Sequence, residues 1–399
     1  MLGEKSLTTK TGNRDRAIRR DKRLKRFARP LRNHIAALTC CAPEAEDLID
    51  SYPALLVALV SPLTTAGQRQ QAFKAILAGQ PLKQIASLLN LPVWLRRMPA
   101  EAFREPIRHL PAEAEFQSKV ANFIPAKASR TREWLEHVSR ADEACGGAFA
   151  LWVAKYCHDI APSRRTPTLM LMAGWAWYAR QPETTGCKLI DTAWTPRMGI
   201  RRANQAQTQW QRRAELACLI GEGIEDPWLQ PGTVNGYAFV PLRTIEDFLN
   251  ESSVMQNCLD QYADRLGTGL IRVFSIRKQG RPVADIEVGP IPERGTPPMI
   301  IQIKARHNRA ASSAVWQAAE VWLEGQELEG LRRRPGYVCF DDQAFKTFWQ
   351  PYLEWLPHGR RGEFMDVLQT FRPPGSPNEL ADRVCNQLAR GRRARPRSF

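Results

Sequence analysis

The sequence has no pair of cysteines at the short spacing that zinc and redox motifs use. Its 9 cysteines are odd in number and scattered along 399 residues. Neither a disulfide framework nor a zinc module is therefore predicted. We expect reduced thiols, a cytoplasmic location, and no cofactor or metal.

The sequence also lacks a long apolar run. The longest such stretch, Leu169–Ala179, is shorter than the roughly 20 residues that a helix needs to cross a bilayer. Residues 1–30 contain no apolar segment of the kind found in a secretory signal. With 43% apolar and 25% charged residues, the composition is that of a globular chain. No membrane span is expected.

Acidic residues are scarce at both ends of the sequence. Of the formal net charge of +16, residues 1–34 carry +9 and residues 390–399 carry +5, which leaves +2 for residues 35–389. Basic segments of this kind favour contact with a polyanion, although two solvated tails are the simpler alternative. The predicted partner is therefore DNA or RNA, and the predicted contacts are Arg19, Arg20, Lys22, Arg23, Lys25, Arg26, Arg392, Arg393 and Arg395.

Between these ends, two kinds of pattern alternate. Residues 35–222 show apolar positions at three-and-four spacing between Pro and Gly, which predicts a domain of short helices. Part of it, Ile85–Leu91, resembles the start of a helix-turn-helix module. However, Pro92, Trp94 and Met98 follow where a polar recognition helix is needed, so core packing is the better interpretation. A helical segment is expected at 331–389, with a short strand at 337–340 before its first helix.

Residues 223–330 read as a smaller α+β domain. Thr244 is a predicted N-cap, and a further helix is predicted over Val254–Leu266 with Cys258 on its buried face. Three strands follow, at Leu270–Lys278, Val283–Gly289 and Met299–Ala305. The fold class is therefore α+β and mostly helical, with a small antiparallel β-meander flanked by helices.

Each predicted strand alternates an apolar with a polar side. A three-residue loop over Gln279–Arg281 would place Phe274 opposite Ile286 and Ser275 opposite Asp285, which keeps the two faces consistent. The polar face then holds one shared set of side chains, namely Ser275, Arg277, Asp285, Glu287, Gln302 and Lys304. A solvated sheet surface is the alternative interpretation of this face.

Several short motifs of this region together resemble the PcfJ-like proteins, a family found on bacterial conjugative plasmids and other mobile or prophage-like elements. The motifs are Met255-x-Asn257-Cys258-x-x-x-Tyr262, Phe274-Ser275-Ile276-Arg277, Ala284-x-Ile286-Glu287, Ile301-Gln302-Ile303-Lys304 and Asn308-Arg309. The resemblance is strongest over about residues 236–310. Asn257 stands where many members have His, so no Cys–His pair is available here.

The resemblance implies a candidate site, with no established reaction, at Cys258, Tyr262, Arg277, Glu287, Gln302 and Asn308. Asn308 is alternatively the N-cap of a following helix over Ala310–Leu323. The organisation expected is a flexible basic arm at 1–34, a helical domain at 35–222, a PcfJ-like domain at 223–330, a helical segment at 331–389 and an Arg-rich tail at 390–399.

Three functions remain open from the sequence. The first is a nucleic-acid-binding accessory protein of a plasmid or prophage. The second is an enzyme of unspecified reaction with its site on the polar sheet face around Cys258, Arg277 and Glu287. The third is an interaction module of a conjugation or phage-related assembly, with protein partners encoded by the same element.

Overall fold

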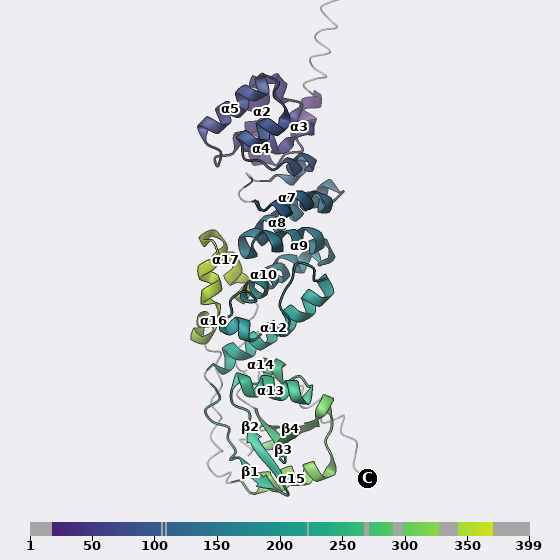
Figure 1. Ribbon diagram of the computed structural model, residues 1–399, viewed down its shortest axis with the longest axis vertical. Coiled ribbons are helices and arrows are strands. Elements are labelled where there is room, and N and C mark those ends of the chain that lie inside the picture. The colour runs from purple at the N-terminus through teal and green to yellow at the C-terminus, as the bar shows by residue number, and fades with distance from the viewer. Residues whose placement is uncertain are drawn as a thin grey trace, which may run out of the picture. The chain divides into compact units, whose positions relative to one another are not determined.

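The structure is a computed structural model, which describes residues 18–104, 107, 110–221, 223–266, 271–289, 298–326 and 342–369 (Figure 1). The chain divides into two compact units: Met1–Trp177 with Thr195–Ile200, and Tyr178–Trp194 with Arg201–Phe399. The predicted strand at 337–340 and the Arg-rich tail at 390–399 lie outside the described residues. In the described ranges, no helix has the length and apolar character that a bilayer crossing demands.

The first unit is built from short helices that start at sequence signals. Pro30 and Pro53 occupy the first turns of their helices, and Thr65 forms a capping box with Gln68. The elements are α2 (Arg29–Cys41), η1 (Pro43–Ala45), α3 (Leu48–Ser51), α4 (Pro53–Val60), α5 (Ala66–Leu77), α6 (Leu82–Leu88), η2 (Val93–Arg97), η3 (Ala100–Ala102), α7 (Ala114–Lys119), η4 (Val120–Phe123), α8 (Ala128–Cys145), α9 (Gly147–Tyr156), η5 (Cys157–Asp159) and α10 (Pro162–Tyr178).

Aromatic side chains form much of the core of this unit. Trp94 is buried and packs edge-on against Phe116 and Trp134. The segment that carries it, η2, is a short 3-10 helix where a DNA-reading module would need a recognition helix. The core interpretation of this segment is therefore confirmed.

Residues 18–34, the described part of the segment expected to be a flexible arm, are folded. Residues 18–24 are helical, and the side chains of Leu24, Phe27 and Leu31 are buried. These three apolar residues lie among the basic ones at helical spacing and anchor the segment to the unit.

The second unit combines a sheet with helices. Its helices are α11 (Thr185–Lys188), α12 (Ile200–Ile220), α13 (Ile245–Met255), η6 (Leu259–Gln261), α14 (Ala263–Leu266), η7 (Arg306–Asn308), α15 (Ser313–Glu324), α16 (Asp342–Trp355) and α17 (His358–Gln369). Its strands are β1 (Gly232–Val234), β2 (Tyr237–Pro241), β3 (Arg272–Lys278), β4 (Arg281–Gly289), β5 (Met299–Ala305) and β6 (Arg309–Ala310). The predicted α+β, mostly helical class is confirmed.

The six strands form one antiparallel sheet in chain order, β1 to β6. Phe274 pairs with Ile286 and Ser275 with Asp285, as predicted. The predicted loop length was wrong, because the turn has two residues, Gln279 and Gly280, both with positive φ. A register shift beside Ile276 restores the alternation that a two-residue turn alone would have broken.

Helices cover both faces of this sheet. On the apolar face, α15 packs Trp322 in parallel on Phe239, with ring centroids 4.4 Å apart, and edge-on to Phe274. On the opposite face lies α13, as Figure 1 shows. The wet polar surface that an antiparallel sheet commonly keeps is therefore absent from the centre of this sheet.

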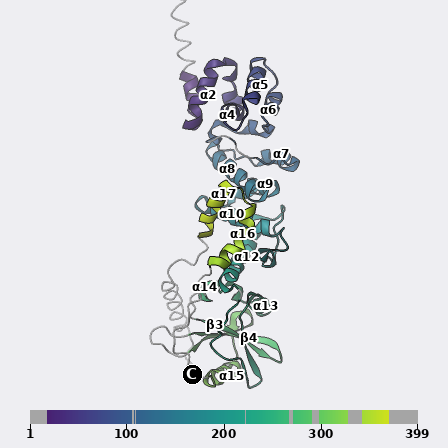
Figure 2. The same ribbon diagram turned by 90° about the vertical axis from the view of Figure 1, so that its left-hand side faces the viewer.

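The helix α16 packs beside α12 in both views (Figures 1 and 2). Trp349 of α16 meets Trp210 of α12 edge-on, with ring centroids 5.7 Å apart. Both side chains are almost fully buried. This aromatic contact connects the last described helices to the helix that precedes the sheet.

Candidate functional site

The covering of the polar face starts with a capped helix. Thr244 Oγ1 accepts a hydrogen bond from Asp247 N, and Asp247 Oδ2 accepts one from Thr244 N at 2.9 Å. This capping box confirms Thr244 as the N-cap of α13. The helix ends at Gln256, whose φ of 50° is left-handed.

The helix predicted over Val254–Leu266 was therefore wrong. After Gln256 the chain crosses the sheet as η6 and α14. Leu259 and Tyr262 are buried as expected, but Cys258 is exposed. The break at Gln256 removes Cys258 from the helical face on which a continuous helix would have placed it.

The first group of polar side chains is centred on Glu251 of α13. Its carboxylate is buried and accepts a hydrogen bond from Ser275 Oγ at 2.6 Å. Arg277 Nε donates to the same Ser275 oxygen at 3.1 Å, and Arg277 Nη2 lies 3.5 Å from Glu251 Oε2. Arg277 thus balances the charge of a carboxylate that α13 brings into the interior.

Asp285 adds a second buried carboxyl group next to Glu251. Burial, together with the charge of Glu251 and a hydrogen bond to it, raises the pKa of Asp285 to about 8. Asn257 Nδ2 donates to Asp285 Oδ2 at 2.5 Å and opposes this shift. Burial beside a second carboxyl group thus favours the protonated form of Asp285.

Glu287 is the centre of the other polar group. Arg265 Nη2 lies 2.5 Å from Glu287 Oε1, and Gln302 Nε2 donates to Glu287 Oε2 at 2.7 Å. Tyr262 donates its hydroxyl to Glu287 Oε2 at 3.3 Å. Burial raises the pKa of Glu287, while Arg265 and these hydrogen bonds lower it. Burial also raises the pKa of the Tyr262 hydroxyl, which keeps it a donor.

A small hollow lies beside these groups, with a volume of about 20 Å³. That volume suffices for a single water molecule. The lining includes five of the six candidate site residues, Cys258, Tyr262, Glu287, Gln302 and Asn308, together with Asn257, Leu259, Val273, Asp285 and Lys304. Residues from η6 and the chain on either side of it, three strands and η7 thus meet at one place.

Arg277 is the candidate residue that does not line this hollow. It belongs to the neighbouring Glu251–Ser275 group. Asn308 is exposed at the rim of the hollow with a positive φ of 56°. The helix predicted from Ala310 begins at Ser313, with Ser312 at its N-cap, so the alternative role of Asn308 as N-cap was wrong.

Three further residues belong to this site and were not among the candidates: Glu251, Asn257 and Arg265. A signal for Glu251 was present in the sequence. It lies three residues after Phe248 and four before Met255, on the buried stripe of α13. A carboxylate at such a position needs a partner inside the protein. No comparable pattern marks Arg265.

The site brings together two buried carboxyl groups with raised pKa values, Asp285 and Glu287, and the Tyr262 hydroxyl, which donates to Glu287. Among the residues that the structure describes, no three His, Cys, Asp or Glu side chains are grouped as a metal ion would require. Cys258 has an exposed thiol at the rim.

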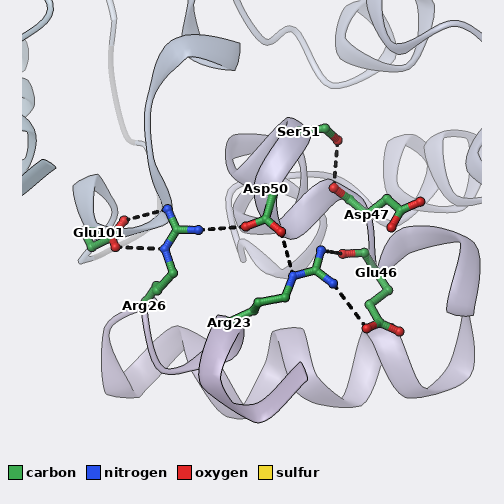
Figure 3. Close-up of polar contacts among 7 residues, drawn as sticks. All are labelled: Arg23, Arg26, Glu46, Asp47, Asp50, Ser51 and Glu101. Carbon is green, nitrogen blue, oxygen red and sulfur yellow. Dashed lines mark hydrogen bonds and ion pairs between the residues drawn. The ribbon is translucent and has the colours of Figure 1, made fainter. Parts of the chain in front are cut away.

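The predicted nucleic-acid contacts in residues 18–34 fall into two groups. Arg23 and Arg26 are held in the network shown in Figure 3: Arg23 Nε lies 2.7 Å from Asp50 Oδ2, and Arg26 Nε lies 2.8 Å from Glu101 Oε1. Their charges are balanced inside the unit.

The remaining predicted contacts of this segment are more accessible. Arg19 and Lys22 are exposed, Lys25 pairs with Asp21, and Arg20 donates to Ala36 O. The other three predicted contacts, Arg392, Arg393 and Arg395, lie outside the described residues.

The fold and the site define an α+β domain in which a helix and a short crossing segment enclose the polar face of a meander sheet. Residues 200–318 match the family model described as PcfJ-like protein. This part of the chain is similar to the PcfJ-like family, and the match begins with α12 and ends within α15. No curated protein and no solved structure matches the chain.

Proposed function

We propose that the protein is a nucleic-acid-binding accessory protein of a mobile genetic element, a plasmid or prophage. The observation that carries this proposal is the concentration of charge, with +9 in residues 1–34 and +5 in residues 390–399 out of +16. Such segments bind phosphates by releasing counterions. The genetic context follows from what the PcfJ-like resemblance implies.

Because residues 18–34 are folded, only some of their basic side chains are free to contact phosphate. Arg19 and Lys22 are exposed and can meet phosphates, whereas Arg23 and Arg26 would first have to leave Asp50 and Glu101. We expect phosphate contact at the first two. Arg23 and Arg26 instead support the fold of the segment that presents them.

The test is the salt dependence of binding to DNA and RNA by the full chain. Arg19→Glu with Lys22→Glu should weaken binding and lower the slope of log Kobs against log salt by about 1 to 2. Lys74→Glu with Lys83→Glu, which reverses two exposed charges elsewhere in the first unit, is the matched control.

A second variant lacks residues 1–17 and 390–399, which keeps Leu24, Phe27 and Leu31 in place. This variant should lose most of the affinity of the full chain for DNA and RNA. Binding that is absent, insensitive to salt, or equally weakened by the control variant would contradict the proposal.

A second candidate function is an enzyme that uses the site on the sheet. The observation that favours it is the meeting of five family-motif residues at one hollow, next to Asp285 with a pKa of about 8. A group that titrates near neutral pH suits acid–base catalysis. If nucleic acid incubated with the protein is altered, Asp285→Asn and Glu287→Gln should abolish the change.

The thiol of Cys258 gives a separate test of that candidate. Cys258→Ser should abolish the activity only if the thiol is the nucleophile. An activity that survives all three substitutions would place the chemistry elsewhere.

A further inference from the structure

A second and larger hollow, of about 590 Å³, lies in the first unit. It is formed between the segment that leads from η4 into α8, the end of α9 and the start of α10. Its volume falls in the range of roughly 300–1,000 Å³ that small-molecule sites occupy. The site on the sheet, with room for one water molecule, could not hold a ligand of this size.

Positive charge dominates the lining of this hollow. Four cationic side chains, those of Lys127, Arg130, Lys155 and Arg165, face one acid, Glu133. Arg165 is already satisfied, because its Nη1 lies 2.6 Å from Glu133 Oε1 and its other nitrogens donate to Ile160 O. The single acid of the lining is therefore neutralised by a cation that the fold holds in place.

The other three cations have no carboxylate partner within the described part of the chain. Lys127, Arg130 and Lys155 are exposed. Lys155 lies over the ring of Tyr156, 4.7 Å from its centroid, a contact that brings no negative charge to it. Three unbalanced cations around one concave site favour an anion with more than one negative oxygen.

Apart from Asn122 and His158, the remaining lining is apolar. Phe123, Ile124 and Pro125 are half-buried, and Pro162 adds to the same lining. A purely inorganic anion would leave this surface without a partner. A ligand with a phosphate group and a flat, weakly polar body would use both parts of the lining, because aromatic and apolar side chains accept the face of a base.

We propose that this hollow binds a mononucleotide unit, with its phosphate at Lys127, Arg130 and Lys155 and its base on Phe123 and Ile124. The unit is either a free nucleotide or the phosphorylated end of a strand. This inference goes beyond the proposed function, because it rests on the hollow alone and requires neither residues 1–17 nor 390–399.

The experiment is titration calorimetry of the full chain with AMP, with a short oligonucleotide that carries a 5′ phosphate, and with the same oligonucleotide without that phosphate. Binding of AMP supports a free nucleotide, and selective binding of the phosphorylated oligonucleotide supports a strand end. Arg130→Glu and Lys155→Glu should each weaken the binding observed by at least about tenfold, because charge-assisted contacts are lost.

The matched control is Arg132→Glu, which makes the same charge change on α8 at an exposed residue outside the hollow. It should leave affinity within about twofold of the parent, since remote exposed charges are largely screened. Arg130→Gln is the milder variant if the reversal disturbs folding, as judged by circular dichroism.

Three results would overturn the proposal. They are no binding of either phosphorylated ligand, equal loss with Arg132→Glu, or unchanged binding in the Arg130 and Lys155 variants. Nucleotide binding that persists in the variant lacking residues 1–17 and 390–399 separates this site from the proposed nucleic-acid contacts.

Discussion

The two faces of the sheet in the second unit are both covered by helices but stabilised in different ways. Against α15 the sheet presents Phe274, Ile276 and Ile286, and the contact is apolar. Against α13 and the segment that follows it the sheet presents Ser275, Asp285 and Glu287, which are equally buried yet bound through hydrogen bonds and ion pairs. An apolar interior gains stability from area alone, whereas a polar interior needs every partner in place.

This difference predicts the largest effect on the apolar face. Trp322→Ala removes the ring that stacks on Phe239 and meets Phe274. We expect a loss of about 3–5 kcal/mol in the free energy of unfolding, measured by urea denaturation. A loss below about 1 kcal/mol would show that α15 contributes little to the core of this unit.

The next largest effect is expected from Glu287→Ala on the polar face. The change leaves Arg265, Gln302 and the Tyr262 hydroxyl without their shared acceptor. Because Arg265 is partly exposed and can reach water, we expect a loss of about 2–3 kcal/mol in urea denaturation. Glu287→Gln, which keeps an acceptor oxygen, should cost less. Equal costs for the two variants would mean that the hydrogen bonds contribute little.

The next effect concerns pH and is smaller when counted per pH unit. Burial and Glu251 raise the pKa of Asp285 to about 8, against an ordinary value near 4. Between these values the folded state holds a proton that the unfolded state has lost, so its stability falls as pH rises from about 4 to 8. Below and above that window Asp285 contributes no slope.

The slope from one such group cannot exceed about 1.4 kcal/mol per pH unit. The charged and polar groups around Asp285 are Glu251, Arg277, Asn257 and, opposite on β3 and β5, Ser275 and Lys304. Asp285→Asn should flatten urea denaturation midpoints across this window. A parent protein whose midpoint rises from pH 5 to pH 8 in the same way as the variant would contradict the assignment.

The smallest effect belongs to the rim of the hollow. Cys258 is exposed, while Cys145, Cys157 and Cys218 are buried, and burial raises the pKa of Cys157 to about 11. In the folded protein a thiol reagent should label Cys258 and leave those three unmodified until denaturant is added. Cys258→Ser should change stability by no more than about 0.5 kcal/mol. Protection of Cys258 would place it inside the polar interior.

Strand alternation was sufficient to predict the pairing of Phe274 with Ile286 and the two-sided character of the sheet. It could not reveal that the turn at Gln279 and Gly280 is short and is compensated by a bulge. The predicted loop was one residue too long, and the bulge beside Ile276 was not predicted. Each difference shifts the pairing by one residue, so together they leave the predicted register unchanged.

The segment that covers the polar face could not be predicted from the sequence for a different reason. Met255, Leu259 and Tyr262 fit a continuous helix by spacing, but Gln256 adopts a left-handed conformation that ends it. The spacing of apolar residues predicts which of them are buried, and this prediction was right for these three. It does not report where a helix stops when no Gly or Pro marks the end.

Charge counting had a similar limit at residues 18–34. It located the excess charge, yet treated all basic residues alike. The pairing of Arg23 and Arg26 with Asp50 and Glu101 depends on tertiary contacts with later helices, which no count over one segment can contain.

The polar face of the sheet is an interior in which burial favours the protonated form of Asp285. The most direct test is the pH titration of the Asp285 carboxyl carbon by NMR, assigned with Asp285→Asn. We expect a midpoint near 8. A midpoint near 4, as for a solvated carboxylate, would contradict this expectation and would mean that Asp285 is exposed to solvent.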